Sequence, residues 1–269
     1  MKKQLIVNAD DYGYTPGISE GIRRAHLEGI VTSTSAMLNG AYIDRELPEL
    51  IRQCPRIGVG LHLVLTVGKP VLPVEELPVL MHLAPDGQHF FKGVENVIDR
   101  VDAEEVKAEW VAQIENFIRL AGRRPDHLDG HHHVMCMGGK FYRIYLELAR
   151  QYGCAVRRPV EGSLADLPER DSLEAGVIIP ERLDTRFYDE GANETMLDAM
   201  IADIPPGTTE WMCHPGVVDE TLRRVSDYSA RRAIELELLT RPAIRRKLEA
   251  SQIDLISFGE LSTQHRGNA

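Results

Sequence analysis

Short apolar runs that predict buried strands alternate with amphipathic runs that predict helices along most of this 269-residue chain. After a first strand that begins at Leu5, we predict strands near residues 31–38, 57–63, 127–129, 155–157, 177–179, 209–213 and 254–257. We predict helices near residues 16–29, 44–53, 102–118, 140–152, 194–201, 227–239 and 243–250. Repeated strand–helix units predict a parallel sheet, and about seven or eight of them fit a distorted, TIM-like (β/α) barrel better than an open sheet.

Residues 66–101 do not follow this alternation. The segment contains many proline, glycine and valine residues and shows little helical period. It is too long for an ordinary strand–helix connection. We predict an insertion over or beside the barrel mouth, which either covers the site, packs on the side of the barrel or contacts a second subunit. Because we find no linker or internal repeat, we predict a single domain over residues 1–269.

The formal net charge of −10 argues against a nucleic-acid partner, which would favour a basic face. The densest basic patches, at residues 223–224, 231–232 and 245–247, fall in helical stretches, and we interpret them as solvated helix faces. We predict no membrane span, since every apolar run is shorter than the roughly 20 residues required. The start of the chain does not resemble a signal peptide, and the four cysteines form no CxxC pair. We therefore predict a cytoplasmic protein with reduced thiols.

Two adjacent carboxylates, Asp10 and Asp11, end the first predicted strand. A buried carboxylate without a partner costs on the order of several kcal/mol or becomes protonated. This pair therefore requires a cation, a proton or a reaction. Adjacent side chains diverge on an extended chain, so we expect only Asp11 to bind a metal ion. Asp10 is then free to act as general base on a water that the metal activates. A turn or a helix cap is the alternative interpretation.

Histidines lie at comparable positions later in the chain. His62 interrupts an apolar run, His131 begins three consecutive histidines, and His214 follows another apolar run. Chemistry gathers at the carboxyl ends of the strands in a parallel barrel, so we expect these rings to meet Asp11. One carboxylate and two imidazoles leave positions open for water and substrate. We predict a divalent metal bound by Asp11, His62 and His131, although a hydrogen-bonded core histidine remains the alternative for His62.

Other polar residues near these strand ends have candidate supporting roles. Asp129 and His131 point the same way along an extended segment, so Asp129 can orient a ligating ring. His133 is the alternative to His131 or a contact for the substrate. Arg157 can orient the general base or bind substrate, and an ordinary surface arginine is the alternative. His214 can donate a proton to a leaving amine or polarise an oxyanion, or it can be structural.

Five segments of the chain resemble the YdjC-like carbohydrate deacetylases. In chain order they are NADDYG at 8–13, GIVTSTS at 29–35, GLHLVLT at 60–66, HLDGHHHV at 127–134 and MCHP at 212–215. The resemblance is collinear from residue 4 to about residue 260. It implies a distorted (β/α) barrel, commonly in a homodimer. It also implies hydrolysis of N-acetyl groups from N-acetylglucosamine-containing sugars such as chitobiose and longer chitooligosaccharides.

The same resemblance implies a divalent metal at Asp11, His62 and His131, with Asp10 as the base and His214 as the acid. The family is associated with Mg²⁺, whereas two imidazoles and one carboxylate suit Zn²⁺, Co²⁺ or Ni²⁺ better.

Two positions depart from the family pattern. Gly130 stands where the family usually has serine, and Met135 stands where it usually has a last histidine. We expect the first of the three histidines to preserve metal binding. The departures predict the loss of a polar contact near the sugar.

Taken together, these features predict a metal-dependent hydrolase that releases acetate from an acetylated sugar. A phosphorylated chitobiose is one form of that substrate, with Arg157 or Arg158 as the anchor. The first alternative is another metal-dependent hydrolase, acting on phosphate esters or cyclic amides. The second is a non-catalytic sugar-binding protein on the same barrel.

Overall fold

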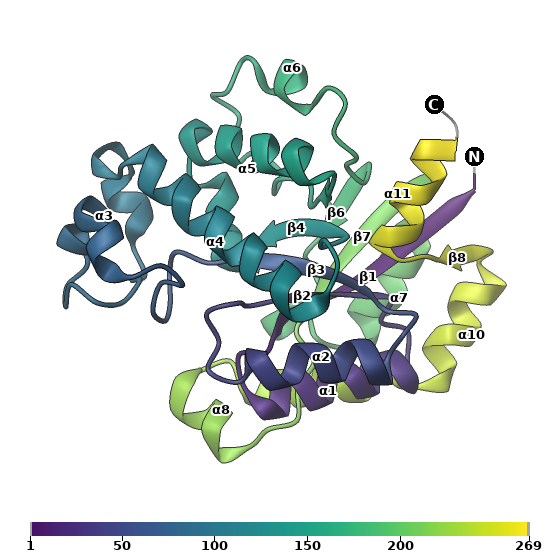
Figure 1. Ribbon diagram of the computed structural model, residues 1–269. Helices are drawn as coiled ribbons and strands as arrows, with labels where there is room; N and C mark the ends of the chain where they lie inside the picture. The colour runs from purple at the N-terminus through teal and green to yellow at the C-terminus, as the bar shows by residue number, and fades with distance from the viewer. Residues whose placement is uncertain (1, 268–269) are drawn as a thin grey trace.

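The computed structural model describes residues 2–267 of the chain (Figure 1). The strands are β1 (Lys3–Tyr12), β2 (Ser33–Ala36), β3 (Gly58–Leu63), β4 (His127–Gly130), β5 (Ala155–Val156), β6 (Arg182–Asp184), β7 (Gly207–Cys213) and β8 (Ile253–Leu255). They form one sheet in the order β5-β4-β3-β2-β1-β7-β6, and β8 pairs with β1. The pairings among these strands are all parallel, as predicted.

The sheet curls into the predicted distorted (β/α) barrel, in which β1 pairs with three other strands. One edge of β1 pairs with β7, while the opposite edge is shared by β8 near its start and β2 near its end. Beyond β5 the backbone N–H of Val156 donates to the carbonyl of Ile178 at 2.9 Å. The prediction of a strand at 177–179 is nevertheless wrong, because Pro180 follows and lacks the N–H that a longer ladder needs.

Helices cover the outside of the sheet at the positions where the sequence predicts them. They are α1 (Pro16–Leu27), α2 (Ile43–Gln53), α4 (Ala103–Ala121), α5 (Gly139–Tyr152), α7 (Glu194–Asp203), α9 (Ala230–Leu239) and α10 (Pro242–Ala250). Their starts follow local capping chemistry. The hydroxyl of Thr15 accepts the backbone N–H of Ile18 at 3.2 Å, and Asp102 accepts that of Glu104 at 2.7 Å.

Outside the segment 66–101, three further helices are not predicted from the sequence: α6 (Arg170–Glu174), α8 (Glu220–Val225) and α11 (Phe258–Gly267). The first two are too short to show a helical period. The third begins with a capping box, in which the Ser257 hydroxyl accepts the N–H of Glu260 and the Glu260 carboxylate accepts the N–H of Ser257. This cap explains why the strand predicted at 254–257 ends earlier, as β8.

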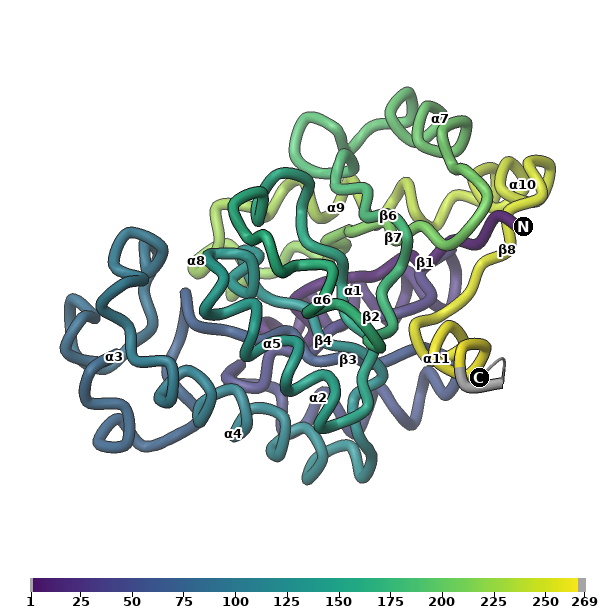
Figure 2. Tube along the Cα trace, turned by 90° about the horizontal axis from the view of Figure 1, so that it is seen from above, coloured from purple at the N-terminus to yellow at the C-terminus, as the bar shows by residue number. Residues whose placement is uncertain are grey.

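Helix α11 closes the end of the barrel at which the strands begin. The apolar side chains of Ile6, Ala155, Phe258 and Leu261 pack together there. Both ends of the described chain lie on this side of the molecule (Figures 1 and 2). The opposite end, where the strands finish, is therefore free to carry polar side chains.

The segment 66–101 forms η1 (Val74–Glu76), α3 (Pro78–Leu83) and η2 (Val94–Arg100). It packs against α4 and projects beside the barrel (Figure 2). Two glutamates of α4 hold it there. The carboxylate of Glu109 accepts two consecutive backbone N–H groups of the insertion at 2.9 Å, and Glu105 accepts two more at 2.9 and 2.7 Å. The insertion therefore packs beside the barrel (Figure 2), and its contact with a second subunit stays a prediction.

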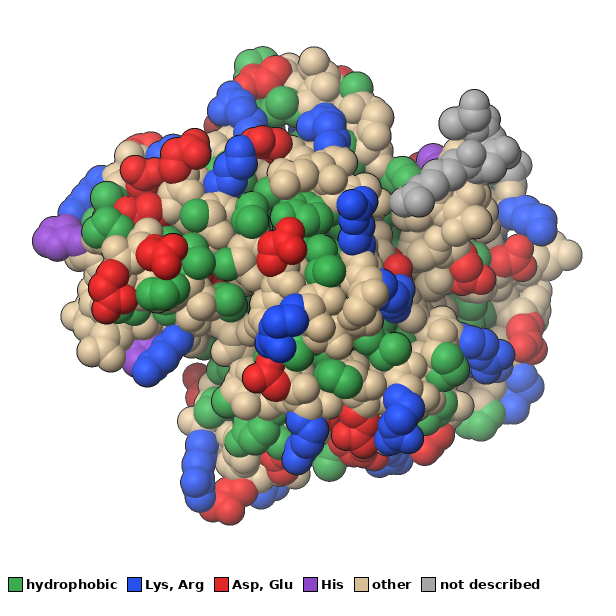
Figure 3. Space-filling view, in the orientation of Figure 1, with side chains coloured by type: hydrophobic (Ala, Val, Ile, Leu, Met, Phe, Trp, Pro, Cys, Tyr) green, Lys and Arg blue, Asp and Glu red, His purple; other side chains and the backbone are tan. Residues whose placement is uncertain are grey.

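Acidic and basic side chains are interspersed on the face drawn in Figure 3. The surface is hollowed between the insertion and α8, where the cavity described below opens. Within residues 2–267, no helix combines the length and the apolar character that crossing a membrane requires.

Candidate active site

Asp10 and Asp11 both line one cavity at the end of β1, although adjacent side chains of an extended strand diverge. Asp11 has a φ of +73°, in the left-handed region, and the pairing of β1 with β2 shifts register between Ala9 and Tyr12. This irregularity turns Asp11 toward the same side as Asp10. A left-handed aspartate is uncommon and persists where its surroundings hold it.

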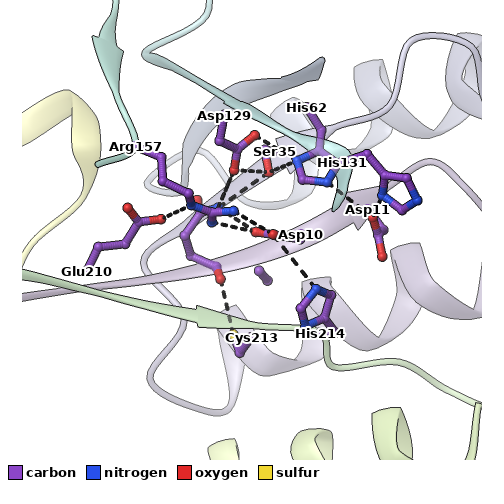
Figure 4. Close-up of polar contacts among 12 residues, drawn as sticks. Asp10, Asp11, Ser35, His62, Asp129, His131, Arg157, Glu210, Cys213 and His214 are labelled. Atoms are coloured by element: carbon purple, nitrogen blue, oxygen red, sulfur yellow. Dashed lines mark hydrogen bonds and ion pairs between the residues drawn. The ribbon is translucent and has the colours of Figure 1, made fainter. Parts of the chain in front are cut away.

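Asp11, His62 and His131 meet in this cavity as predicted (Figure 4). Each offers one ligand atom, and these atoms lie within 4.8 Å of one another. Oδ1 of Asp11 lies 2.9 Å from Nδ1 of His131 and 3.4 Å from Nε2 of His62. Three separate strand ends thus direct one oxygen and two nitrogens to one point, which is the donor set that a catalytic transition-metal site uses.

The surroundings of His62 show that a cation fits this point. Its Nδ1 donates to Oδ1 of Asp129 at 2.7 Å, so in the neutral ring Nε2 would present a lone pair to Asp11. Two acceptors facing each other require a positive charge between them. Burial lowers the pKa of His62, but Asp129, Asp11 and Asp10 outweigh burial and raise that pKa to about 10. A divalent ion would supply the charge that these carboxylates otherwise draw from a proton.

From its position in an extended segment, Asp129 was expected to orient His131. In the structure it is hydrogen-bonded to the ring of His62 instead. The strand ends at Gly130, and His132 and His133 then adopt left-handed conformations with φ of 53° each. The turn directs His131 away from Asp129. The second oxygen of Asp129 accepts the hydroxyl of Ser35 at 2.8 Å. Asp129 therefore fixes the ring of His62, one of the candidate metal ligands, through the nitrogen that does not face Asp11.

Arg157 orients Asp10 and has no access to substrate. Its Nη1 and Nη2 donate to the two oxygens of Asp10 at 2.7 Å each, and Nε donates to Glu210 at 2.8 Å. Arg157 is 0% exposed, so the prediction that it anchors a substrate phosphate is wrong. Arg158 uses its Nε to bind the carbonyl of Pro180. Burial raises the pKa of Asp10, but Arg157 outweighs burial, and the net pKa is lowered.

Glu210 is a member of this network that the sequence analysis does not predict. Burial raises its pKa to about 7, and Arg157 only partly opposes that effect. Its second oxygen has no hydrogen-bond partner among residues 2–267. The available signal was a lone glutamate inside the apolar strand β7, which is costly unless a charge faces it.

His214 lies across the cavity from the ligand set. Its Nε2 is 3.8 Å from Oδ2 of Asp10, and its Nδ1 has no partner in the described part of the chain. Burial lowers the pKa of His214 to about 4, so the ring is neutral at neutral pH. The backbone N–H of His214 donates to Glu235 of α9, which fixes the end of β7.

The sequence analysis predicts the wrong environment for Arg232. The patch at 231–232 was interpreted as a solvated helix face, yet Arg232 is 4% exposed and its Nη2 donates to Oδ2 of Asp11. Arg232 shares the buried face of α9 with Glu235, Leu236 and Leu239. This helical spacing was the signal that Arg232 faces inward.

The cavity has a volume of about 800 Å³ and carries aromatic side chains on its wall. Tyr188 and Tyr228 stack with ring centroids 4.5 Å apart and an interplanar angle of 11°. His133 also lines the cavity, and within residues 2–267 its Nδ1 has no partner. Lys92 of the insertion contributes to the wall as well. This volume and mixture of aromatic and polar groups are typical of small-molecule sites.

The two departures from the family pattern occupy different environments. Gly130 lines the cavity, but Met135 is completely buried in the core. A Cβ atom at Gly130 would lie 3.1 Å from Sδ of Met135, closer than an ordinary contact. The methionine thus fills the space behind the glycine, and the expectation that it removes a contact near the sugar is wrong for Met135.

The sequence of this chain is similar to those of known proteins. The sequence profile of the family described as YdjC-like protein matches residues 4–250. A carbohydrate deacetylase of Enterococcus faecalis is 35% identical over 267 residues, which cover 97% of this chain and 98% of that protein. A chitooligosaccharide deacetylase of Salmonella paratyphi B is 37% identical over 249 residues, which cover 91% and 94%.

A solved structure from Enterococcus faecalis, described by reference to cellobiose-phosphate cleavage, resembles this fold closely. Its TM-score is 0.89 at 33% sequence identity, and the match covers 97% of this chain and 99% of that one. The likeness extends over the whole barrel and not over one motif alone.

Proposed function

The chain belongs to the YdjC-like protein family, and on this premise we propose that it removes the acetyl group from N-acetylglucosamine-containing sugars with the help of a divalent metal ion. The enzyme is a hydrolase of a linear amide bond, and its substrates are chitobiose and longer chitooligosaccharides. The relatives named carbohydrate deacetylase and chitooligosaccharide deacetylase support this reaction class. The observation that carries the proposal is the convergence of Asp11, His62 and His131 beside an ionised Asp10.

Asp11, His62 and His131 would hold the ion through one oxygen and two nitrogens. When bound, a divalent ion polarises the acetyl carbonyl and makes water more acidic. The donor set favours Zn²⁺, Co²⁺ or Ni²⁺, whereas the family resemblance favours Mg²⁺. Metal analysis of protein purified without chelator distinguishes these ions.

Asp10 is the general base in this proposal. It takes a proton from water as the water oxygen bonds to the acetyl carbon. Arg157 keeps Asp10 ionised and oriented through two hydrogen bonds. A carboxylate with a lowered pKa is a weak base, so it depends on water that is already acidified. This requirement explains why the base lies directly beside the ligand set.

His214 completes the proton transfer. The acetamide bond breaks when its nitrogen leaves, and that nitrogen needs the proton that Asp10 has taken. Nε2 of His214 lies 3.8 Å from Oδ2 of Asp10, close enough to pass this proton onward after a small movement. The ring of His214 is neutral at first, receives the proton of Asp10 on Nε2, and as the acid delivers it from that atom to the departing nitrogen. Acetate and a free amino sugar result.

The cavity wall suits a sugar. The stacked rings of Tyr188 and Tyr228 offer an apolar surface, and the neighbouring polar groups can bind hydroxyls. If the sugar carries a phosphate, the cations available to it are Lys92, Arg224 and Arg231 at the cavity mouth, because Arg157 is enclosed.

Acetate release from N,N′-diacetylchitobiose tests the proposal, with and without chelator. We expect release that requires metal, disappears in Asp10→Asn and persists in Asp44→Asn, which removes an exposed carboxylate from α2. No release from chitobiose, its phosphate or longer oligomers, with several added metals, would reject the substrate. Turnover of phosphate esters or cyclic amides would then indicate another hydrolase, and tight sugar binding without acetate release would indicate a binding protein.

A further inference from the structure

The two carboxylate oxygens of Asp11 have different partners. Oδ1 lies 2.9 Å from Nδ1 of His131 and 3.4 Å from Nε2 of His62, so it faces the ligand set. Oδ2 points away from that set and accepts a hydrogen bond from Nη2 of Arg232. One oxygen is thus available to an ion, while a guanidinium already holds the other.

The protein fixes Arg232 independently of any ion. Its Nε donates to the carbonyl of Tyr228 at 3.0 Å, and its guanidinium carbon lies 5.6 Å from the centroid of the same ring. The stem passes over Gly216, where an added Cβ would lie 3.3 Å from both Cβ and Cδ of Arg232. Gly216 therefore provides the room in which the side chain reaches Asp11.

The ion pair between Arg232 and Asp11 is buried on both sides, with side chains 5% and 2% exposed. Within residues 2–267, Arg232 is the one lysine or arginine in ion-pair distance of Asp11. Water screens a buried pair only weakly. A metal ion that approached Oδ2 would have to displace this fixed positive charge.

We propose that Arg232 is a positioning residue that restricts Asp11 to one metal-binding oxygen. The inference rests on the metal site of the proposed function. A carboxylate that binds through both oxygens takes an additional coordination position. A catalytic site needs such positions for water and substrate. Arg232 keeps one coordination position open and also weakens the attraction of Asp11 for the ion. The site is therefore more accessible to water and substrate but binds the ion less tightly.

Co²⁺ binding to metal-depleted protein tests this role without any substrate. The variants are Arg232→Gln and, as the matched control, Arg231→Gln, which removes the same charge from the same helix beside Asp189 and Glu190. We expect R232Q to bind Co²⁺ about tenfold more tightly than the wild type, because the competing cation is gone. We also expect weaker visible absorption, since a second Asp11 oxygen raises the coordination number. R231Q should keep the wild-type spectrum.

Two further variants separate positioning from folding. R232M keeps the apolar stem and is used instead of R232Q if a thermal melt shows that R232Q is unfolded. R232K retains the charge and should keep the wild-type Co²⁺ spectrum. A folded R232Q or R232M protein that retains the wild-type Co²⁺ spectrum, or binds Co²⁺ more weakly, overturns the proposal. If the Co²⁺ measurements give the expected results but the wild type releases no acetate, only the deacetylase assignment is contradicted. If the wild type binds no Co²⁺, the metal site itself is rejected.

Discussion

Arg157 donates to both carboxylate oxygens of Asp10 through two different nitrogens, each at 2.7 Å; Arg157 is fully buried, whereas Asp10 still lines the cavity. The third nitrogen, Nε, donates to Glu210 on the opposite side. The guanidinium therefore cannot rotate without losing a charged partner. This arrangement fixes the direction of Asp10 at the edge of the proposed metal site (Figure 4).

Replacing Arg157 by lysine should separate charge from geometry. An ammonium group keeps the positive charge but cannot bridge Asp10 and Glu210 with a planar fork. We expect kcat for deacetylation to fall on the order of 100-fold, because a small misplacement of the base is costly, with little change in KM. Arg158→Lys, beside it in the chain, is the control and should retain wild-type kinetics. A wild-type kcat in R157K would show that Asp10 does not need this fork.

Asp129 and His62 make a second testable pair. The hydrogen bond at 2.7 Å places the proton on Nδ1 and leaves Nε2 free for an ion. In Asp129→Asn the amide oxygen is a weaker acceptor and carries no charge. We expect the affinity of metal-depleted protein for Zn²⁺ to fall at least about tenfold. Calorimetric titration measures the change.

The control for this prediction is Ser35→Ala. Its hydroxyl lies 2.8 Å from the second oxygen of Asp129 and 3.2 Å from Nδ1 of His62, so it supports the pair without carrying charge. The loss of affinity should be smaller in S35A than in D129N. Equal affinities in all three proteins would mean that the ring of His62 is oriented by packing alone.

The sequence predicts which site residues lie at the ends of strands. Asp11, His62 and His131 each follow or end an apolar strand, and parallel strands finish at the same end of a barrel. Their meeting therefore follows from topology once the strands are recognised. The positions of Asp10 and Arg157 follow from the same topology, since both also stand at strand ends.

The partners of these residues could not be read in the same way. Arg232 reaches Asp11 across 221 positions of the chain, and local charge patterns do not reveal such a contact. Asp129 was expected to serve His131 because an extended geometry was assumed through Gly130. The left-handed residues after that glycine depend on tertiary packing, which alternation of polar and apolar residues does not encode.

The aromatic wall of the cavity supports a prediction about substrate binding. Tyr188 is 45% exposed, and its ring stacks on Tyr228 with its centroid 5.4 Å from that of the His214 ring. We expect Tyr188→Ala to raise KM about fivefold, which corresponds to a loss of about 1 kcal/mol of aromatic contact, with a smaller effect on kcat. Tyr188→Phe keeps the ring and should preserve KM. An unchanged KM in Y188A would place the sugar elsewhere in the cavity.

His127 allows a prediction about stability that does not depend on function. It is 0% exposed, stacks on Phe258 with ring centroids 3.9 Å apart, and neither ring nitrogen has a hydrogen-bond partner in the described chain. Burial lowers its pKa to about 4, whereas a histidine in an unfolded chain titrates near about 6.5. As the pH falls below that value, the unfolded state therefore gains its proton first. The stability contributed by neutral His127 is complete above about pH 6.5 and is lost progressively toward pH 4.

Between pH 7 and pH 5 this difference corresponds to about 2 kcal/mol of unfolding free energy. We expect the wild type to lose about that much more stability over this interval than His127→Leu, which cannot titrate at this position. Urea unfolding at several pH values measures both curves, and His82→Leu, which removes an exposed imidazole from α3, controls for the substitution itself. Parallel curves for the wild type and H127L would show that His127 is protonated equally in the folded and unfolded states. In that case an ionised partner or water, and not burial alone, would have to set its charge.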